Sequence, residues 1–260
     1  MKLALIQMTS VLDSKANLKK IEGWLTEARG LGARAVFLPE CFYSMSNGLK
    51  PSTDLIDEND QNCPHEKALR DLVQKTGIAI IGGSAATKSS KGILNRTYSF
   101  DQSGKKLPAY DKRKLFACRL SEKSITESDI YTAGSTPQVL EFEELKIGLG
   151  ICFDIRFSSL AHDYRLAGVN LLTYASAFTV PTGKAHWHLL NRARAVENQC
   201  FVISSAQVGQ HNERLSTYGH SLVVDPWGDV LVDAGDEEGC FVFEIDLARV
   251  EKVRNSVLMG

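Results

Sequence analysis

Apolar runs of strand length alternate with helical segments in this chain, and the same order of elements occurs twice. Near-continuous apolar strands separated by segments of helical periodicity are typical of sheets that helices cover on at least one face. In the first half these elements are the strand "KLALIQM", a helix over 15–31, the strand "RAVFLPE", a helix over 64–76, the strand "GIAIIGGSA", and two hairpin-like strands around "NRTYSF" and "KLPAY".

The order begins again at Leu145. Two β-rich halves, each with helices between its first strands, pack most economically sheet against sheet with the helices outside. We therefore predict an α/β fold, a four-layer αββα sandwich, in a single domain over 1–260. The elements of the second half are the strand "LKIGLGI", a helix over 158–167, the strand "GVNLLTYAS", a helix over 183–198, the strand "QCFVISSAQ", the hairpin "HSLVVDPWGDVLVDA" with its turn at Asp225 to Gly228, and the strand "CFVFEID".

The composition excludes several classes of partner. A formal net charge of -1 with 23% charged residues gives no basic surface suited to nucleic acid or to an anionic membrane. No apolar run reaches the ~18–20 residues of a membrane span. The short run at the start, interrupted by Gln7, predicts a strand and not a signal peptide. Six scattered cysteines without a CxxC pair favour a reducing, cytoplasmic location.

Two reactive side chains stand at predicted strand ends. Glu40 ends the second strand of the first half, and Cys152 ends the first strand of the second half. The carboxyl ends of strands in α/β folds are where ligands and reacting groups collect. Between the halves, the polar segment over 110–135 is longer than an ordinary connection, which predicts a functional loop.

Cys152 has both a structural and a chemical interpretation. A free cysteine is most often an inert core residue, and a nucleophilic thiol needs a base and a nearby positive charge. None of the six histidines lies in a motif tied to Cys152, so a papain-like site is not favoured. The stronger combination is Glu40 in "FLPEC", Lys112 in "YDKRKLF" and Cys152 in "GICFD". Lys112 taken alone would belong to a solvated charge run.

These three motifs, together with "GKAHWHLLNRARAVENQ" and "GHSLVVDPWG", resemble the carbon-nitrogen hydrolase (nitrilase) superfamily, and closely its Nit-type amidases, from Leu3 to about Arg254. The resemblance implies the αββα sandwich and a Glu40-Lys112-Cys152 triad. Glu40 would be the general base, and Lys112 would stabilise the oxyanion with the backbone N–H that follows Cys152. The reaction would proceed through a thioester, release ammonia, and need no metal or organic cofactor.

The resemblance also implies the surroundings of the triad. Glu127 would orient the lysine or the substrate amide, and we expect Asp154 and Arg156 to form a structural ion pair that fixes the turn after Cys152. The residues that would shape or bind the acyl part of the substrate are Tyr43, Phe153, Phe178 and Thr179.

Three neighbouring features have structural interpretations. Cys41 follows Glu40, and since adjacent strand residues point to opposite faces, it should point away from the site. His186 and His188 are two apart on a predicted helix and do not face each other, which favours cap, core or interface roles over a metal site. Lys114 stands where the family usually has a histidine, so it either alters the charge preference for substrates or faces solvent.

The favoured function is cofactor-free hydrolysis of the terminal amide of a small carboxylate-bearing metabolite. The segment "AQVGQHNERLSTYGHSLVVDPWG" is most similar to the branch acting on deaminated glutathione, with ω-amidase action on α-ketoglutaramate as the nearest alternative. A nitrilase or N-carbamoyl hydrolase with the same triad, and a scaffold protein that keeps the fold, are the others; the intact triad argues against the scaffold. The resemblance implies a homodimer or higher homo-oligomer, although the chain stops at "NSVLMG", short of the usual tail.

Overall fold

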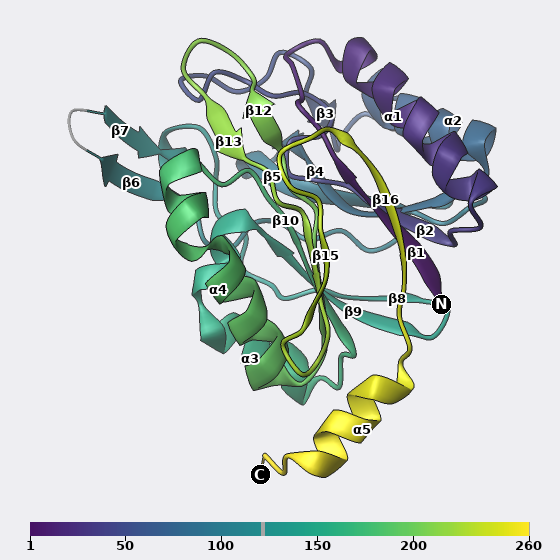
Figure 1. Cartoon of the computed structure of the whole chain (residues 1–260). Coiled ribbons are helices and arrows are strands. Elements are labelled where there is room, and N and C mark those ends of the chain that lie inside the picture. Colours follow the sequence, from purple (N-terminus) through teal and green to yellow (C-terminus); the bar gives the residue numbers. More distant parts are fainter. Residues whose placement is uncertain (121–122, 260) are drawn as a thin grey trace.

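The computed structural model describes residues 1–120 and 123–259 and contains two six-stranded sheets (Figure 1). In the first sheet, β1 pairs in parallel with β2 and β2 with β4, while β16 and β5 add antiparallel strands to β1 and β4. Its strands in spatial order are β16 (Gly239–Glu244), β1 (Lys2–Gln7), β2 (Ala35–Phe37), β4 (Ala79–Ser89) and β3 (Ile56–Asp57), with β5 (Gly92–Phe100) also on β4.

The second sheet is built on the same plan. Its three central strands are parallel, and antiparallel strands close it on both sides. In spatial order they are β15 (Val230–Asp233), β14 (Leu222–Val224), β11 (Phe201–Ser204), β10 (Leu171–Ala175), β9 (Leu145–Ile151) and β8 (Val139–Phe142). Two small antiparallel pairs lie outside the sheets: β6 (Ala117–Leu120) with β7 (Lys123–Thr126), and β12 (Val208–Gln210) with β13 (Ser216–Tyr218).

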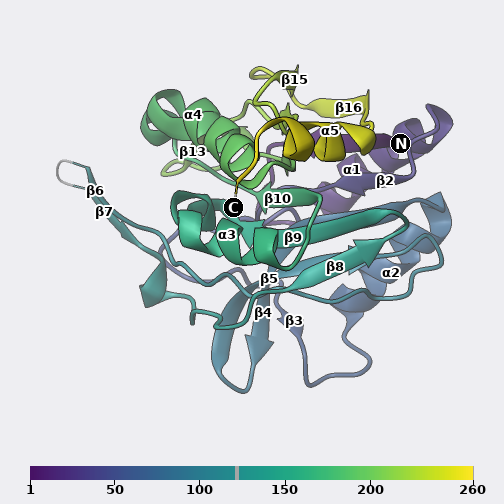
Figure 2. The same ribbon diagram turned by 90° about the horizontal axis from the view of Figure 1, so that it is seen from below.

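Helices lie on the outer faces of the two sheets, as Figures 1 and 2 show. The helices are α1 (Ser14–Gly30) and α2 (Pro64–Thr76) in the first half, α3 (Ser158–Leu166) and α4 (Val180–Asn198) in the second, and α5 (Ala248–Ser256) near the C-terminus. Local signals set their limits: the Asp13 carboxylate accepts from two N–H groups of the first turn of α1, and α2 begins at a proline and ends before Gly77, at a φ of 64°.

Successive residues of β1 belong to two different hydrophobic clusters. Leu5 packs in the larger cluster, which also holds Ile147 of the second sheet, whereas Ile6 packs in the other cluster with Ile21 of α1. A strand with one face on a sheet and the other on a helix has this alternation. The prediction of a four-layer αββα sandwich is therefore confirmed. No helix among the described residues has the length and apolarity needed to cross a membrane.

One predicted strand is present but joins the other sheet, and a second predicted strand is not formed. The strand "CFVFEID" was assigned to the second half, but β16 pairs with β1 of the first sheet, where Leu3 lies opposite Phe243. The segment "KLPAY" forms no named strand and makes one isolated bridge, between Phe100 and Lys106. Pro108 in this segment has no N–H to give to a ladder, which is consistent with that outcome.

Candidate active site

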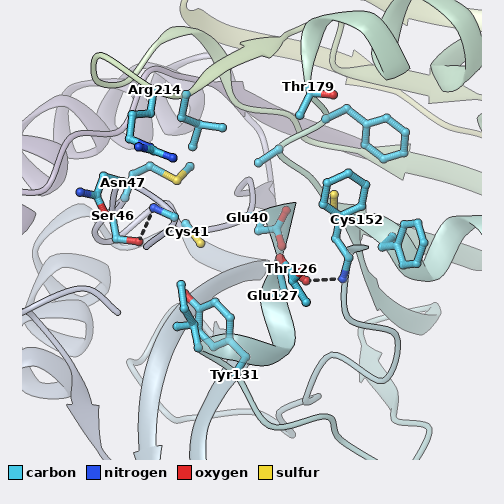
Figure 3. Close-up of a pocket in the computed structure, with 18 of the residues that line it drawn as sticks. Glu40, Cys41, Ser46, Asn47, Thr126, Glu127, Tyr131, Cys152, Thr179 and Arg214 are labelled. Carbon is cyan, nitrogen blue, oxygen red and sulfur yellow. Dashed lines mark hydrogen bonds between the residues drawn. The ribbon is translucent and has the colours of Figure 1, made fainter. Parts of the chain in front are cut away.

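One cavity, of about 290 Å³, brings together residues from both halves of the chain (Figure 3). Glu40 comes from the turn after β2, Cys152 from the end of β9, and Glu127 from the start of a short 3-10 helix, η1 (Glu127–Asp129). All three line the cavity, and Lys112 is bonded to both carboxylates. The strand ends and the connecting loop that the sequence singled out therefore meet at one place.

Cys152 sits on a tight turn at the end of a buried strand. It begins a second 3-10 helix, η2 (Cys152–Arg156), and its φ is 46°, in the left-handed region that non-glycine residues seldom adopt. The strand before it approaches its neighbour closely, because a Cβ on Gly150 would lie 2.7 Å from the Tyr174 ring. This geometry directs the thiol into the cavity (Figure 3), although Cys152 is only 7% exposed.

The Lys112 ammonium is fully buried between two carboxylates. Its Nζ lies 2.8 Å from Glu40 Oε1 and 2.8 Å from Glu127. Asn95 donates to the same Glu40 oxygen at 2.8 Å, and the Phe116 N–H donates to Glu127 at 2.7 Å. Burial disfavours the charged lysine, but the carboxylates of Glu127 and Glu40 outweigh it and hold the pKa of Lys112 well above its usual value. The two carboxylates therefore favour the charged form of Lys112.

The pKa values of two acidic groups near this ammonium, Glu127 and Cys152, are raised above their usual values. Burial raises the pKa of the Glu127 carboxyl, against the effect of Lys112. Burial, followed by the charge of Glu40, also raises the pKa of the Cys152 thiol well above its usual value, and Lys112 opposes this. The resting thiol is consequently protonated at neutral pH, so a reaction at Cys152 needs a group that accepts its proton.

Asp154 joins the turn at Cys152 to the segment that carries Lys112. Its Oδ2 accepts from the Ile151 N–H at 2.9 Å and from the Tyr110 hydroxyl at 2.8 Å, and its Oδ1 accepts from the Lys114 N–H at 2.9 Å. The expected ion pair with Arg156 was wrong. The Asp154 carboxylate instead accepts hydrogen bonds from these three donors.

Arg156 instead lies in the cavity wall. Its guanidinium stands 5.3 Å from the centre of the Phe178 ring and 5.8 Å from that of Phe153, and its Nη2 is 3.2 Å from His186 Nδ1. Two aromatic faces and an imidazole hold the cation at the cavity. This leaves its remaining donors for a ligand, because an aromatic face takes up none of the N–H groups.

Three of the four predicted pocket residues, Phe153, Phe178 and Thr179, line the cavity, and Tyr43 does not. Tyr43 is 2% exposed in the cluster beneath α1, and its hydroxyl lies 2.7 Å from His65 Nδ1. The prediction for Tyr43 is therefore wrong for this cavity.

Cys41 was expected to point away, but it lines the cavity. The strand argument fails because β2 already ends at Phe37 and Cys41 lies in a turn, at a φ of 53°. Burial, and then Glu40, raises the pKa of the Cys41 thiol. Lys114 is not among the residues that line the cavity. Its ammonium lies 5.0 Å from the centre of the Phe157 ring.

A sequence model of the family described as carbon-nitrogen hydrolase matches residues 2–255. The chain belongs to this family. Among curated relatives, the omega-amidase NIT2 of Homo sapiens is 34% identical over 259 residues, covering 98% of this chain and 92% of that protein. NitFhit of Drosophila melanogaster, a nitrilase and fragile histidine triad fusion protein, is 36% identical. This chain spans 55% of its length.

Solved structures agree with this assignment of a carbon-nitrogen hydrolase. Nit3 of Saccharomyces cerevisiae, a member of branch 10 of the nitrilase superfamily, superposes with a TM-score of 0.89 at 30% identity, covering 100% of this chain and 94% of that one. An amidase from Nesterenkonia sp. superposes with a TM-score of 0.82 at 25% identity, covering 99% and 96%. The predicted family, Nit-type amidases, and the enzyme class, an amidase, are confirmed.

Several residues at the cavity of this carbon-nitrogen hydrolase were missed by the sequence interpretation. The loop over 45–49 and the tip of the β12–β13 hairpin, with Arg214 and Leu215, complete the wall, and Tyr131 lies on it as well. A polar hairpin tip gives no signal of which cavity it reaches. Only the long connection over 110–135 was marked in advance as functional, by its length.

Proposed function

We propose that this carbon-nitrogen hydrolase cleaves the terminal amide of a small metabolite that also bears a carboxylate, using Glu40, Lys112 and Cys152. One observation carries the proposal: a buried ammonium is shared by two carboxylates that line the same cavity as the Cys152 thiol, which is held on a strained turn. An amide is a poor electrophile, and attack on it needs both an activated sulfur and a fixed cation facing its oxygen.

The proposed reaction begins with transfer of the Cys152 thiol proton to the Glu40 carboxylate as the sulfur attacks the amide carbon. The negative charge that develops on the amide oxygen is stabilised by the Lys112 ammonium and the Phe153 N–H, which lies in the first turn of η2, where N–H groups have no acceptor within the helix. Collapse returns the proton to the leaving nitrogen and releases ammonia. Glu40 then takes a proton from water, which attacks the thioester and regenerates the thiol as the free carboxylate leaves.

Two arginines support the assignment of a carboxylate-bearing substrate. Arg156 and Arg214 both line the cavity, and Figure 3 shows Arg214 and Asn47 on the side opposite Cys152. A guanidinium binds a carboxylate through two parallel hydrogen bonds. A substrate with its amide at Cys152 and its carboxylate at Arg214 would span the cavity. The NIT2 relatives are omega-amidases, which agrees with this class.

The test is a comparison of substrates for the purified protein. We expect ammonia release from α-ketoglutaramate, from deaminated glutathione or from both, and little turnover of nitriles or N-carbamoyl compounds with the same acyl chain. Faster turnover of deaminated glutathione would favour the branch suggested by the hairpin sequence, and faster turnover of α-ketoglutaramate the omega-amidase branch. Failure of the protein with intact Cys152 to release ammonia from any short ω-amide would exclude the proposal.

The role of Arg214 has an internal control. Replacing it by glutamine should raise KM for ω-amides that bear a carboxylate by about 10- to 100-fold, as expected for the loss of a charge-assisted hydrogen bond. The KM for an uncharged amide of the same length should change little. Equal changes for the two substrates would show that Arg214 acts on the shape of the cavity and not on a carboxylate.

We further propose a homodimer formed through α3 and α4, in a reducing cytoplasmic compartment. Leu166 on α3 is 75% exposed and Leu189 on α4 is 68% exposed, which is consistent with a covered face. All six cysteines are free, which agrees with a reducing environment. Light scattering should give a dimer that Leu189→Glu dissociates and that Leu12→Glu, a change at an exposed leucine elsewhere, leaves intact. A wild-type monomer at all concentrations would contradict this.

A further inference from the structure

A cluster of two imidazoles and one carboxylate lies outside the active-site cavity. His188 Nε2 is 2.9 Å from Asp233 Oδ2, and His220 Nδ1 is 2.8 Å from Asp233 Oδ1. The three potential ligand atoms all lie within 4.8 Å of one another. We propose that His188, His220 and Asp233 bind a divalent transition-metal ion, with Zn²⁺ as the best match.

The chemistry of the three groups fits such an ion. Two imidazole nitrogens and one carboxylate form a ligand set used by Zn²⁺, with a fourth position left for water or another ligand. Ligand atoms about 2.0–2.2 Å from a tetrahedral zinc lie about 3.3–3.6 Å apart. The two imidazoles now contact different oxygens of Asp233. With one of these oxygens as the ligand, its contact would lengthen by about half an ångström, and the other imidazole would turn toward the same oxygen. The metal ion would take the place of the two N–H protons that now point at the carboxylate, and each neutral imidazole would carry its proton on the other ring nitrogen.

The backbone fixes the ligands that come from the β-hairpin region. His220 has a φ of 54°, and its N–H donates to the Gly235 carbonyl at 2.6 Å. Its ring stacks on the Tyr218 ring, with centroids 4.4 Å apart. The Gly235 N–H donates to Asp233 Oδ1 at 3.0 Å. Contacts of this kind orient metal ligands before the ion arrives.

The third ligand, His188, belongs to α4, so the ion would link that helix to the end of β15. The side chains of His188, His220 and Asp233 are 37%, 26% and 36% exposed, which gives an ion access from solvent. His186, two residues earlier, contacts Arg156 instead. This agrees with the prediction that the two histidines of "AHWH" do not face each other.

The proposed site lies directly behind one wall of the active-site cavity. Trp187 donates from Nε1 to the His220 carbonyl at 2.6 Å, and its ring packs on Phe178, which lines the cavity, with centroids 4.7 Å apart. The Tyr218 N–H donates to the Phe178 carbonyl at 2.9 Å. A metal ion that ties α4 to β15 would thus hold this wall in place, and it would stabilise the folded chain in proportion to its affinity.

The experiment is a titration of the full-length, chelator-treated protein with Zn²⁺, followed by calorimetry and by metal analysis after dialysis. We expect about one ion per chain and a higher unfolding temperature with Zn²⁺. Single changes His188→Gln, His220→Gln and Asp233→Asn should each weaken binding by at least about tenfold. The matched control is His162→Gln, at an exposed histidine of α3 outside the cluster, which should bind as the wild type does.

A second probe keeps the result independent of stability and of the thiols. Co²⁺ in a tetrahedral site gives visible d–d absorption, which should form in the wild type and in a Cys152→Ala variant and be lost in the three cluster variants. Circular dichroism in chelator would verify that each variant is folded. Absence of binding, or binding of equal strength in the cluster variants, would overturn the proposal. The three side chains would then only form hydrogen bonds that link α4 to β15.

Discussion

The turns after β2 and after β9 each place a cysteine in the same cavity, yet they have different chemical surroundings. Cys41 and Cys152 both adopt a positive φ, 53° and 46°, and burial raises the pKa of both thiols. The N–H of Cys41 donates to Ser84 Oγ, whereas Cys152 begins a helical turn. Access to the cavity and a shifted pKa are therefore common to both cysteines, and neither identifies a nucleophile.

The difference lies in what each turn holds in place. The turn after β2 presents the carboxylate that precedes its cysteine, since Glu40 is bonded to Lys112 and Asn95. The turn after β9 presents its own thiol and is tied by Asp154 to the Lys112 segment. In the proposed reaction one turn would supply the base and the other the nucleophile, and this division can be tested by changing each in turn.

The largest expected effect separates the two thiols. Cys152→Ala should lower kcat/KM for ω-amides by at least about 10,000-fold, because the nucleophile is lost. Cys41→Ala should keep activity within about tenfold of the wild type, since it removes one group from the cavity wall and none from the reaction. Steady-state ammonia release measures both. Comparable losses in the two variants would remove the distinction between the turns.

The next largest effect concerns the ammonium between the turns. Lys112→Met should lower kcat by at least about 100- to 1,000-fold, because one stabiliser of the oxyanion is lost. It should also destabilise the fold by about 3–5 kcal/mol, since Glu40 and Glu127 are left buried without their cation. The double variant Lys112→Met with Glu127→Gln should recover part of the stability in urea unfolding but not the activity. Recovery of both would mean that Lys112 is only structural.

A smaller effect is expected where the second turn is tied to the Lys112 segment. Asp154→Asn replaces an acceptor of three hydrogen bonds by a group that can accept on one side only, and we expect kcat to fall by about 10- to 100-fold through misplacement of the thiol. The KM should change less, and stability should fall by about 1–3 kcal/mol. Asp163→Asn on the exposed surface of α3 is the control. An unchanged kcat with lowered stability would limit Asp154 to a structural role.

The smallest effect is a dependence of stability on pH. In the unfolded chain a thiol ionises near pH ~8.5, whereas burial and Glu40 keep Cys152 protonated in the folded protein. Above that pH the unfolded state has lost a proton that the folded state keeps, so stability falls as pH rises, by about 1.4 kcal/mol per pH unit for this group. Cys152→Ala should lose less stability than the wild type between pH 8.5 and 10, and Cys41→Ala likewise. Parallel stability curves for all three proteins would contradict the raised thiol pKa values.

Local patterns in the sequence predicted most of the elements. Helix α1 was predicted over 15–31 and runs from Ser14 to Gly30, and the prediction of 64–76 for α2 matches Pro64–Thr76. Capping and apolar periodicity are local signals, which explains this agreement. The pairing of β16 with β1 joins residues some 240 positions apart, as in Leu3 opposite Phe243, and no local pattern specifies it.

The sequence predicted those residues of the site that lie in recognisable motifs. Glu40, Lys112, Glu127 and Cys152 each lie in a motif of the family, and the structure brings them together. The direction of Cys41 depended instead on where β2 ends, which is three residues before the predicted end at Glu40. The partners of Asp154 and the position of Arg214 follow from tertiary packing between separate segments. A single sequence does not state such contacts.

The most direct test of the central claim is identification of the acylated residue. The protein is mixed with an ω-amide, quenched with acid during turnover, digested and analysed by mass spectrometry. We predict an acyl adduct, with ammonia released, on the peptide that contains Cys152 and none on the peptide that contains Cys41. An adduct on Cys41, or turnover that persists in Cys152→Ala, would contradict the assignment of Cys152 as the nucleophile.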